Sequence, residues 1–512
     1  MEYNLLNAPF TRTFAPKFLK LLNTSLSPCN DPPFTGSTRN VRDLLSKHPG
    51  FLWLPIDKNT RKAARLCPKR LFNEIKTFFL KDTVTYSIIS DNNEDEEQFV
   101  KTILKKLKKE WLKYSWNSKP KKLPYLYLVV KSDGVRFRPI GSYAPCPYKY
   151  LLSKASTALY CLLLFTGAKH FNVSKITEVK EQVRIFAENA KLQNLNIHSD
   201  TFDIKDFFTA VQKKFMLQRL QFFKTLFIKR NGTDIISVPK SIYKDKNLKP
   251  HPGADLTHKY INFTLDTLIE IVIFALDNAF FKLGHYIIQQ IAGLTMGDPL
   301  SPPLAILNVC YDEHAFKLPY QIPNSLVLII RYVDDILRFI ACLPNNEIFI
   351  NYVDFAIKYL LYEHDLPVKS LSVIQDFNES TKFLDADVII SKNKKQVKLV
   401  FHNKNSDIMK TLSQDIGRFF HAFDCTHIQT KIAAFANILV RAFDATTFPI
   451  DCIPAIIELM SEVFTLQYTF FDMHSALIKA NRIRKNPMWK KAHNLVSFIF
   501  TKMDVTSRKY IS

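Results

Sequence analysis

The chain has 512 residues and a formal net charge of +23, from 70 Lys and Arg against 47 Asp and Glu. Hydrophobic residues make up 47% of it and aromatic residues 13%, which excludes a basic disordered tail, and the 11 glycines are too few for collagen, repeat scaffolds or Gly-rich linkers. The positive excess favours a polyanionic partner, either nucleic acid or an anionic membrane surface.

Cysteine spacing and apolar run length exclude further classes of protein. The eight cysteines are scattered, and no two lie two to four residues apart, so neither a structural zinc site nor a disulfide framework is expected. A reducing, intracellular compartment is favoured. The longest apolar runs, 158–165 and 268–281, are shorter than the ~20 residues of a membrane span, so we expect no membrane partner. The N-terminal segment predicts no secretory signal.

The first part of the chain mixes helical and strand patterns. Residues 1 to about 90 show no clear periodicity. Apolar residues at helical spacing over 101–113, with lysines opposite, predict an amphipathic helix that either lies on the protein surface or contacts phosphates. Residues 126–130 and 135–140 predict two strands around a turn, and 149–166 predicts a helix.

The remaining elements alternate in the same way. Residues 196–203 predict a strand that leads into a helix, and 256–283 predicts one long, mostly apolar helix. Two apolar runs, 325–330 and 335–340, predict a buried hairpin, and 349–364 predicts a helix.

The last part of the chain changes from strand to helix. Residues 382–390 and 396–402 predict a further hairpin around a Lys-rich turn. From about 407 onward the pattern is helical.

The strongest local signal is a pair of adjacent carboxylates, Asp334 and Asp335, at the turn of the apolar hairpin. Such carboxylates repel each other and are costly to desolvate. A divalent cation removes that cost, and Mg²⁺ prefers hard oxygen ligands of this kind. An ordinary polar turn is the alternative, because Asp is a good turn former.

A third carboxylate, Asp203, ends the strand predicted at 196–203, and Phe208 follows it. Two-metal phosphoryl transfer needs carboxylates from different strands to hold two ions about 4 Å apart. Folding would therefore have to join Asp203 with Asp334. Taken alone, Asp203 is explained at least as well as a helix N-cap.

Between these sites, residues 293–305 combine two glycines with three prolines and then become apolar, which predicts a tight loop that feeds a helix. Gly297 would let the backbone approach a nucleotide or a template strand. Ser301 with Pro302 would begin the helix. A purely structural turn is the alternative.

In chain order, these segments resemble the motifs of reverse transcriptases. Residues 132–140 are similar to the fingers strands, 203–208 to the first catalytic motif and 293–305 to the template and nucleotide loop. Residues 332–335 resemble the second catalytic motif, and 381–385 resembles the turn that grips the primer. The motifs are specific as an ordered set and weak singly.

The details resemble the Penelope-like element reverse transcriptases, which are relatives of telomerase. The family's Met-Gly-x-Pro-Leu-Ser-Pro loop is matched by 296–302, its Arg-Pro-Ile by 138–140 and its Phe-Leu-Asp by 383–385. Asp298 and Asp206 stand where the family usually has small residues. No GIY-YIG nuclease is apparent, so we expect a member without that endonuclease.

The resemblance implies an α+β right-hand polymerase fold, with fingers, a palm made of an antiparallel sheet plus helices, and a helical thumb. Residues 1–120 would form a mostly helical N-terminal extension and 121–198 the fingers. The palm would span 199–405, with an insertion at about 215–285, and 406–512 would form the thumb or C-terminal region.

The resemblance also implies roles for individual residues. Two Mg²⁺ ions, with Mn²⁺ as an alternative, would be held by a metal set of Asp203, Ile204, Asp334 and Asp335. The catalytic set would be Asp203, Asp334, Asp335 and the general acid Lys369, for which Lys358 and Lys382 compete. The nucleotide set would be Lys131, Arg138, Asp206, Phe208, Met296 and Gly297, with Phe208 as the gate against a 2′-hydroxyl. The primer and template set would be Phe383, Leu384, Asp385 and Lys404.

The implied function is an RNA-directed DNA polymerase that extends a DNA or RNA primer on an RNA template with dNTPs. We expect an intracellular protein, located in the nucleus rather than in the cytoplasm or an organelle. An RNA-directed RNA polymerase is the first alternative, and Phe208 argues against it because viral RNA polymerases usually have a polar group there. A catalytically idle, reverse-transcriptase-derived RNA-binding protein is the second, and the intact carboxylates argue against it.

Overall fold

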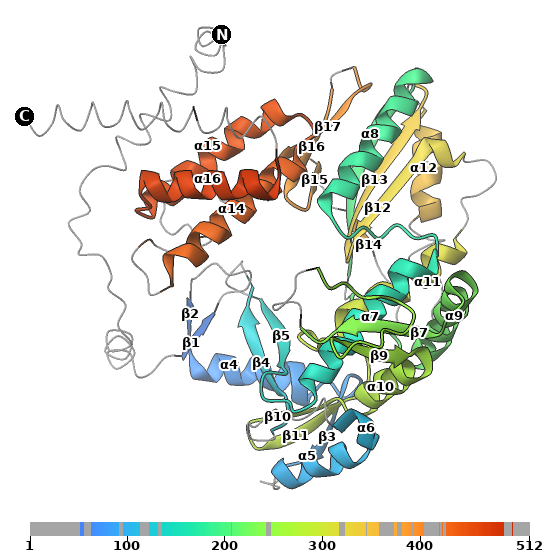
Figure 1. Ribbon diagram of the computed structural model, residues 1–512, viewed down its shortest axis with the longest axis vertical. Helices are drawn as coiled ribbons and strands as arrows, with labels where there is room; N and C mark the ends of the chain where they lie inside the picture. Colours follow the sequence, from blue (N-terminus) through green and yellow to red (C-terminus); the bar gives the residue numbers. More distant parts are fainter. Residues whose placement is uncertain are drawn as a thin grey trace, which may run out of the picture.

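The computed structural model contains helices and sheets in mixed order (Figure 1). It describes residues 52–55, 63–91, 96–112, 122–131, 136–205, 207–241, 247–316, 323–344, 346–357, 373–375, 381–391, 393–403, 419, 422, 426–485 and 494.

The element that positions the site is a four-stranded antiparallel sheet in the order β12-β13-β6-β14. Helix α8 (Ile176–Leu192) runs along this sheet, and α12 (Glu347–Phe355) follows β13 (Figure 1). The strands are β6 (Asn196–Ile204), β12 (Val327–Tyr332), β13 (Asp335–Cys342) and β14 (Val373–Gln375). The strand predicted at 196–203 and the hairpin predicted at 325–340 are confirmed.

The sheet is buried on both faces because successive residues of β13 point into different hydrophobic cores. Ile336 and Ile340 belong to the core that also holds helices α7 and α11. Leu337 and Phe339 belong to a second core that holds α8 and the C-terminal helices. Continuous apolar runs are typical of such doubly covered strands. The buried arginines within them, Arg331 and Arg338, are paired with acidic residues.

A second sheet has the strand order β3-β11-β10-β4-β5. The pair β4–β5 confirms the strands predicted at 126–130 and 135–140. The sheet also takes in residues from before and well after this pair. Its strands are β3 (Tyr86–Ser90), β4 (Tyr125–Val130), β5 (Phe137–Ser142), β10 (Phe280–Leu283) and β11 (Tyr286–Gln290).

The long helix predicted at 256–283 is wrong at both ends. Helix α10 spans only Leu265–Asp277, because the Thr264 side chain caps its start and accepts from the Thr267 N–H. The preceding residues form β9 (Tyr260–Thr264), which pairs with β7 (Ile235–Pro239) and, through it, with the short β8 (His251–Pro252). Aromatic and β-branched residues in this stretch favour strands once a pairing partner is present.

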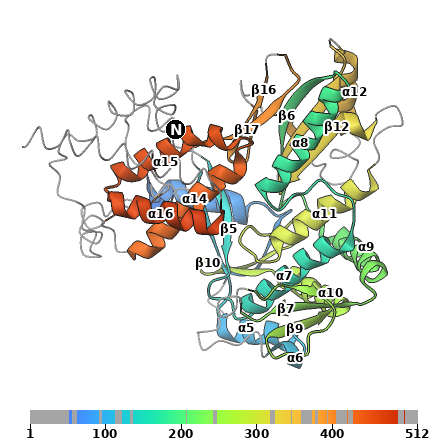
Figure 2. The same ribbon diagram turned by 45° about the horizontal axis from the view of Figure 1, so that its top comes forward.

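Four helices pack together beside the central sheet, and both views show them as one group (Figures 1 and 2). Helix α7 (Lys149–Thr166) has the predicted bounds. It contacts α10 and α9 (Lys213–Asn231), and α11 (Ser301–Ala315) packs against α7 and α9. Helix α11 begins at Ser301 with Pro302 in its first turn, as the sequence predicts.

The helix predicted at 101–113 is split into α5 (Glu96–Lys105) and α6 (Lys109–Leu112). After the break, Trp111 of α6 stacks on Phe263 at 5.4 Å between ring centroids. Its lysines contact protein groups: Lys106 donates to Asn278 at 2.9 Å and Lys108 pairs with Glu270 at 2.5 Å. These contacts favour the surface-helix interpretation over the phosphate-contacting one.

Residues before 90, where the sequence shows no clear period, include regular elements. Strands β1 (Leu52–Pro55) and β2 (Ala63–Leu66) form an antiparallel pair. Helix α4 (Pro68–Ile75) follows and continues into one π-helical turn over Lys76–Leu80.

The hairpin predicted at 382–402 is a three-stranded sheet. Its strands are β15 (Thr381–Phe383), β16 (Ala386–Ile390) and β17 (Val397–Phe401). A turn at Leu384, with φ of 56°, divides the segment predicted as one strand. The later helices α14 (Ile428–Ala445), α15 (Ile453–Thr465) and α16 (Phe470–Ile483) confirm the helical pattern from 428 onward and lie beside this sheet (Figure 1). Most of 404–425, where the helical prediction begins, lies outside the described residues.

Across the part of the chain that the structure describes, every helix is too short or too polar to cross a membrane.

Phe339→Ala tests the central sheet. Phe339 is fully buried, so truncation should lower the free energy of unfolding by about 3 to 5 kcal/mol through lost burial and a new cavity. The control is Leu256→Ala, because Leu256 is 96% exposed and its loss should change stability by less than about 0.5 kcal/mol. Urea unfolding measures both, and equal effects would contradict the double-sided core.

Candidate active site

Three carboxylates converge at one end of the central sheet. In the register of β6 against β13, Asp203 lies directly opposite Asp335. The Ile204 N–H donates to the Asp334 carbonyl oxygen at 3.0 Å, which ties the turn to the end of β6. Ligand oxygens of Asp203, Asp334 and Asp335 all lie within 4.8 Å of one another. Antiparallel pairing therefore joins motifs that are far apart in the chain.

The turn that carries Asp334 is tight and strained. Tyr332 pairs with Asp335, so Val333 and Asp334 alone connect β12 to β13. Val333 has a φ of 60°, in the left-handed region that a β-branched residue rarely adopts. Strain of this kind concentrates at functional sites, where surrounding contacts over-determine the backbone.

The donor set fits a divalent cation. Asp334 is half-buried, and Asp203 and Asp335 are exposed at the sheet end, so all three carboxylates can reach an ion from solvent. Like charges placed directly opposite on a sheet destabilise it, and a hard cation removes that repulsion. The Ile204 side chain is a buried hydrocarbon with no donor atom, so this residue could contribute only its backbone carbonyl oxygen.

Phe207 and Phe208 follow β6, the strand that carries Asp203, and they differ in burial. Phe207 is buried at 4% exposure and packs in the core, whereas Phe208 is half-buried. Their rings meet edge to face at 5.3 Å between centroids. Phe207 thus supports the ring of Phe208, which keeps a surface available beside the carboxylates' strand.

The loop after β11 lies against residues that follow β6, and two glycines allow its close contacts. The Leu294 N–H donates to the Phe208 carbonyl oxygen at 2.9 Å. A Cβ on Gly293 would lie 2.8 Å from the Thr209 backbone, and Gly293 has a φ of 70°. Only glycine fits such an approach at positive φ.

The same loop is fastened to β5 at its other end. The Gly141 N–H donates to the Met296 carbonyl oxygen at 2.7 Å. A Cβ on Gly297, which has a φ of 104°, would lie 2.2 Å from the Gly141 carbonyl oxygen. Met296 is half-buried and Gly297 exposed. The loop therefore bridges the strand of Asp203 and the strand of Arg138.

The Asp298 side chain holds this loop in place. Its carboxylate accepts from the Leu300 N–H at 2.8 Å and from the Tyr143 hydroxyl at 3.1 Å. Burial of the carboxyl group raises its pKa to about 6, although both hydrogen bonds and the charge of Lys213 oppose the shift. Lys213 lines the same small cavity, and burial lowers its pKa to about 8.

Two basic candidates lie on the β4–β5 pair. Arg138 of β5 pairs with Val129 of β4. Lys131 directly follows β4, and its N–H donates to the Arg136 carbonyl oxygen at 2.7 Å. Both side chains are half-buried. Strand β5 is connected to the loop by the hydrogen bond between Gly141 and Met296.

The candidates for primer contact lie at the β15–β16 turn. Phe383 is 2% exposed and packs in the second core, so it anchors the turn from inside. Leu384 and Asp385 are half-buried at the turn itself. Asp385 forms an ion pair with Arg441 of α14, which connects this turn to the C-terminal helices.

Asp206, Lys369 and Lys404 lie outside the described residues, as does Lys358, and their roles stay predictions. Lys382, the other competitor for the general acid, is exposed on β15.

The residues that hold the strained turn were not among those predicted from the sequence. Arg331 is fully buried, pairs with Glu313 and donates to the Val333 carbonyl oxygen at 2.7 Å. A signal was present, because an arginine inside an apolar strand requires a buried partner. The sequence does not identify that partner, Glu313, because it lies on a different element, helix α11.

No family model matches the sequence, and no curated protein matches it. Among solved structures the chain is similar to apo telomerase from Candida tropicalis, at 12% identity over 90% of this chain and 78% of that one, with a TM-score of 0.48. It is also similar to Candida albicans telomerase in complex with a telomeric RNA fragment, at 12% identity over 89% of this chain and 74% of that one, with a TM-score of 0.44. A third similar structure is the Sicinivirus RNA-dependent RNA polymerase, at 10% identity over 72% of this chain and 70% of that one, with a TM-score of 0.36.

Asp298→Asn should stabilise the protein at neutral pH. The buried carboxyl has a raised pKa, so its ionised form opposes folding above about pH 6. Each unit of elevation corresponds to about 1.4 kcal/mol, and we expect Asn to raise the free energy of unfolding by about 1 to 3 kcal/mol at pH 7.5. The gain should shrink as the pH falls from about 6 to about 4, where the folded wild type is protonated.

Urea unfolding across this pH range measures the difference between Asp298→Asn and wild type. Tyr143→Phe is the companion variant, since losing the hydroxyl that donates to the carboxylate should move the transition to higher pH. A difference between Asn and wild type that does not change with pH would contradict the assignment.

Proposed function

We propose that the chain is a template-directed nucleotidyltransferase, and more narrowly an RNA-directed DNA polymerase that extends a primer on an RNA template. The observation that carries the proposal is the convergence of Asp203, Asp334 and Asp335 at the end of two paired strands. Carboxylates from two strands at this separation are the arrangement that two-metal phosphoryl transfer requires.

The residues of the chain have separate tasks in this proposal. Asp203 and Asp334 would hold two Mg²⁺ ions, with Mn²⁺ as an alternative, and Asp335 would support them. When bound, the ions supply Lewis-acid chemistry that activates a primer 3′-hydroxyl and neutralises the triphosphate. Arg138 and Lys131 would contact the triphosphate, Arg138 as a bidentate fork and Lys131 as a point charge.

Phe208 would select the sugar. It is half-buried, it follows the strand of Asp203, and its carbonyl oxygen is hydrogen-bonded to the loop that ends in Met296 and Gly297. Buried Phe207 keeps its ring from moving aside. A bulky, supported ring at this place would clash with a 2′-hydroxyl, which favours dNTPs and therefore a DNA product.

The architecture suits the same proposal. The central sheet would serve as the palm, the β3-β11-β10-β4-β5 sheet as fingers, and helices α14, α15 and α16 as the thumb. A net charge of +23 suits a protein that follows a phosphate backbone. Assignment to the Penelope-like group is part of the proposal and depends on the loop at 296–302.

Primer extension tests the proposal. With an annealed RNA template, Mg²⁺ and either dNTPs or rNTPs, we expect extension with dNTPs alone. The double variant Asp334→Ala/Asp335→Ala should lose it by at least ~10³-fold, because removal of the ligands abolishes transition-state stabilisation. Extension with rNTPs would assign an RNA polymerase. Salt-dependent RNA binding with no extension would favour an idle RNA-binding protein.

Phe208→Val tests sugar selection separately. The smaller side chain should admit rNTPs and lower the preference for dNTPs by at least ~10-fold, since the clash with the 2′-hydroxyl is removed. The ratio of kcat/KM for dNTP and rNTP measures the effect. Phe207→Leu is the control, because the buried ring next to it should affect stability more than sugar choice. Unchanged selectivity in Phe208→Val would exclude the gate.

A further inference from the structure

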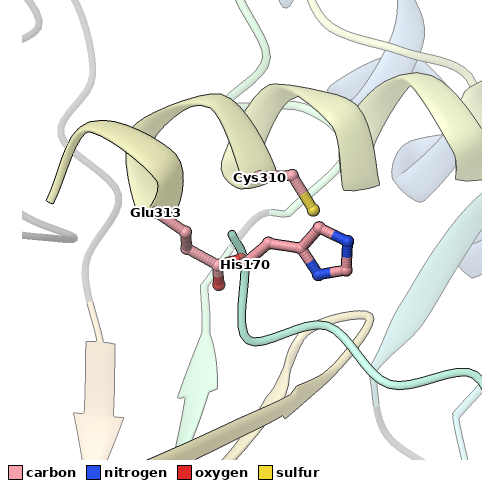
Figure 3. A group of neighbouring side chains, drawn as sticks. All are labelled: His170, Cys310 and Glu313. Atoms are coloured by element: carbon pink, nitrogen blue, oxygen red, sulfur yellow. The ribbon is translucent and has the colours of Figure 1, made fainter. Parts of the chain in front are cut away.

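A second cluster of potential metal ligands lies behind the strained turn. His170 precedes α8, and Cys310 and Glu313 lie on α11 with their side chains directed toward it (Figure 3). Their ligand atoms lie within 4.8 Å of one another. By residue type alone, a cysteine, a histidine and a carboxylate could hold a transition metal.

The cluster already contains a cation, the guanidinium of Arg331. Its Nε donates to Glu313 Oε1 at 2.5 Å, and its Nη2 donates to Glu313 Oε2 at 3.0 Å and to Cys310 Sγ at 3.2 Å. The Phe171 N–H also donates to Glu313 Oε2, at 3.1 Å. A metal ion would have to displace the guanidinium. The geometry therefore favours, over a metal site, a hydrogen-bonded group of Arg331, Glu313 and Asn172, which we call the arginine clamp.

The arginine clamp is hydrogen-bonded to the turn that carries Asp334. Nη1 of Arg331 donates to the Val333 carbonyl oxygen at 2.7 Å and to Asn172 Oδ1 at 3.3 Å. The same Asn172 oxygen accepts from the Val333 N–H at 3.4 Å. Both backbone polar groups of Val333, which has a φ of 60°, are therefore bound by the clamp.

The backbone of Arg331 is fixed as well. Its N–H donates to the Phe171 carbonyl oxygen at 2.8 Å, and its carbonyl oxygen accepts from the Val173 N–H at 2.8 Å. The side chains of Arg331 and Glu313 are both fully buried. A buried ion pair contributes little net stability, but it can impose one specific geometry, and here that geometry ends at the turn.

We propose that Arg331, held by Glu313 and aided by Asn172, is a positioning residue that keeps Val333 at positive φ and thereby places Asp334 beside Asp203. The inference rests on the proposed function to the extent that Asp334 holds a metal ion. Arg331 acts through the backbone of Val333, and it does not touch the substrate or the ions. Partners of ligands that act in this way commonly change metal affinity by roughly 10- to 100-fold when altered.

The test is a rescue experiment on Mn²⁺ binding. Electron paramagnetic resonance measures the affinity for the Mn²⁺ that wild type binds and Asp334→Asn does not. Arg331→Lys keeps the charge beside Glu313 but loses the fork that reaches Val333. It should weaken this Mn²⁺ binding roughly 10-fold or more. Adding Val333→Gly should restore most of the affinity, because glycine adopts a positive φ without help.

A second buried arginine provides the matched control. Arg338 of β13 is 1% exposed and pairs with Asp200 and Asp354, away from the turn. Arg338→Lys should lower the unfolding temperature but leave Mn²⁺ affinity within about twofold of wild type. If Arg331→Lys does not fold, Asn172→Ala replaces it, since this variant keeps the buried ion pair and still loosens Val333.

The outcomes separate this inference from the proposed function. Equal Mn²⁺ affinity in Arg331→Lys and Arg338→Lys would overturn the inference, as would weakened binding that Val333→Gly does not restore. Stoichiometric zinc in the purified protein, lost in Cys310→Ser, would overturn it in favour of a metal site. Wild type that binds Mn²⁺ through Asp334 but extends no primer would refute the polymerase and leave the clamp standing.

Discussion

The pairing of β6 with β13 is the constraint on which the candidate site depends. Its register places Asp203 opposite Asp335, and the Ile204 N–H binds the Asp334 carbonyl oxygen. A slip of one residue would turn one of the facing carboxylates to the other face of the sheet. Because each face of the sheet belongs to a different hydrophobic core, the packing of the whole chain fixes this register.

Much of the site could be predicted because its chemistry is encoded locally. Carboxylates at the ends of apolar runs identified Asp203, Asp334 and Asp335, and two glycines identified the loop around Met296. Convergence could not be derived from spacing alone, since it depends on pairing between distant strands. The resemblance to reverse transcriptases supplied that step, and the register agrees with it.

The failures share one physical cause, which is tertiary contact. The long helix predicted at 256–283 is interrupted because β9 and β10 find partners in two different sheets. Leu384 divides a predicted strand by adopting a φ of 56°, which no local pattern indicated. Arg331 was visible as a charge in an apolar run, but its partner Glu313 lies on another element. Sequence patterns thus located the carboxylates and missed the groups that orient them.

Anomalous diffraction from crystals grown with Mn²⁺, an RNA template, a DNA primer and a non-hydrolysable dNTP would show whether these carboxylates hold the ions. We expect two manganese peaks about 4 Å apart, both contacted by Asp203 and Asp334, with the triphosphate beside them. Nucleotide bound at the sheet end with no manganese at these carboxylates would contradict it. Manganese bound elsewhere in the chain, with this cluster empty, would contradict it equally.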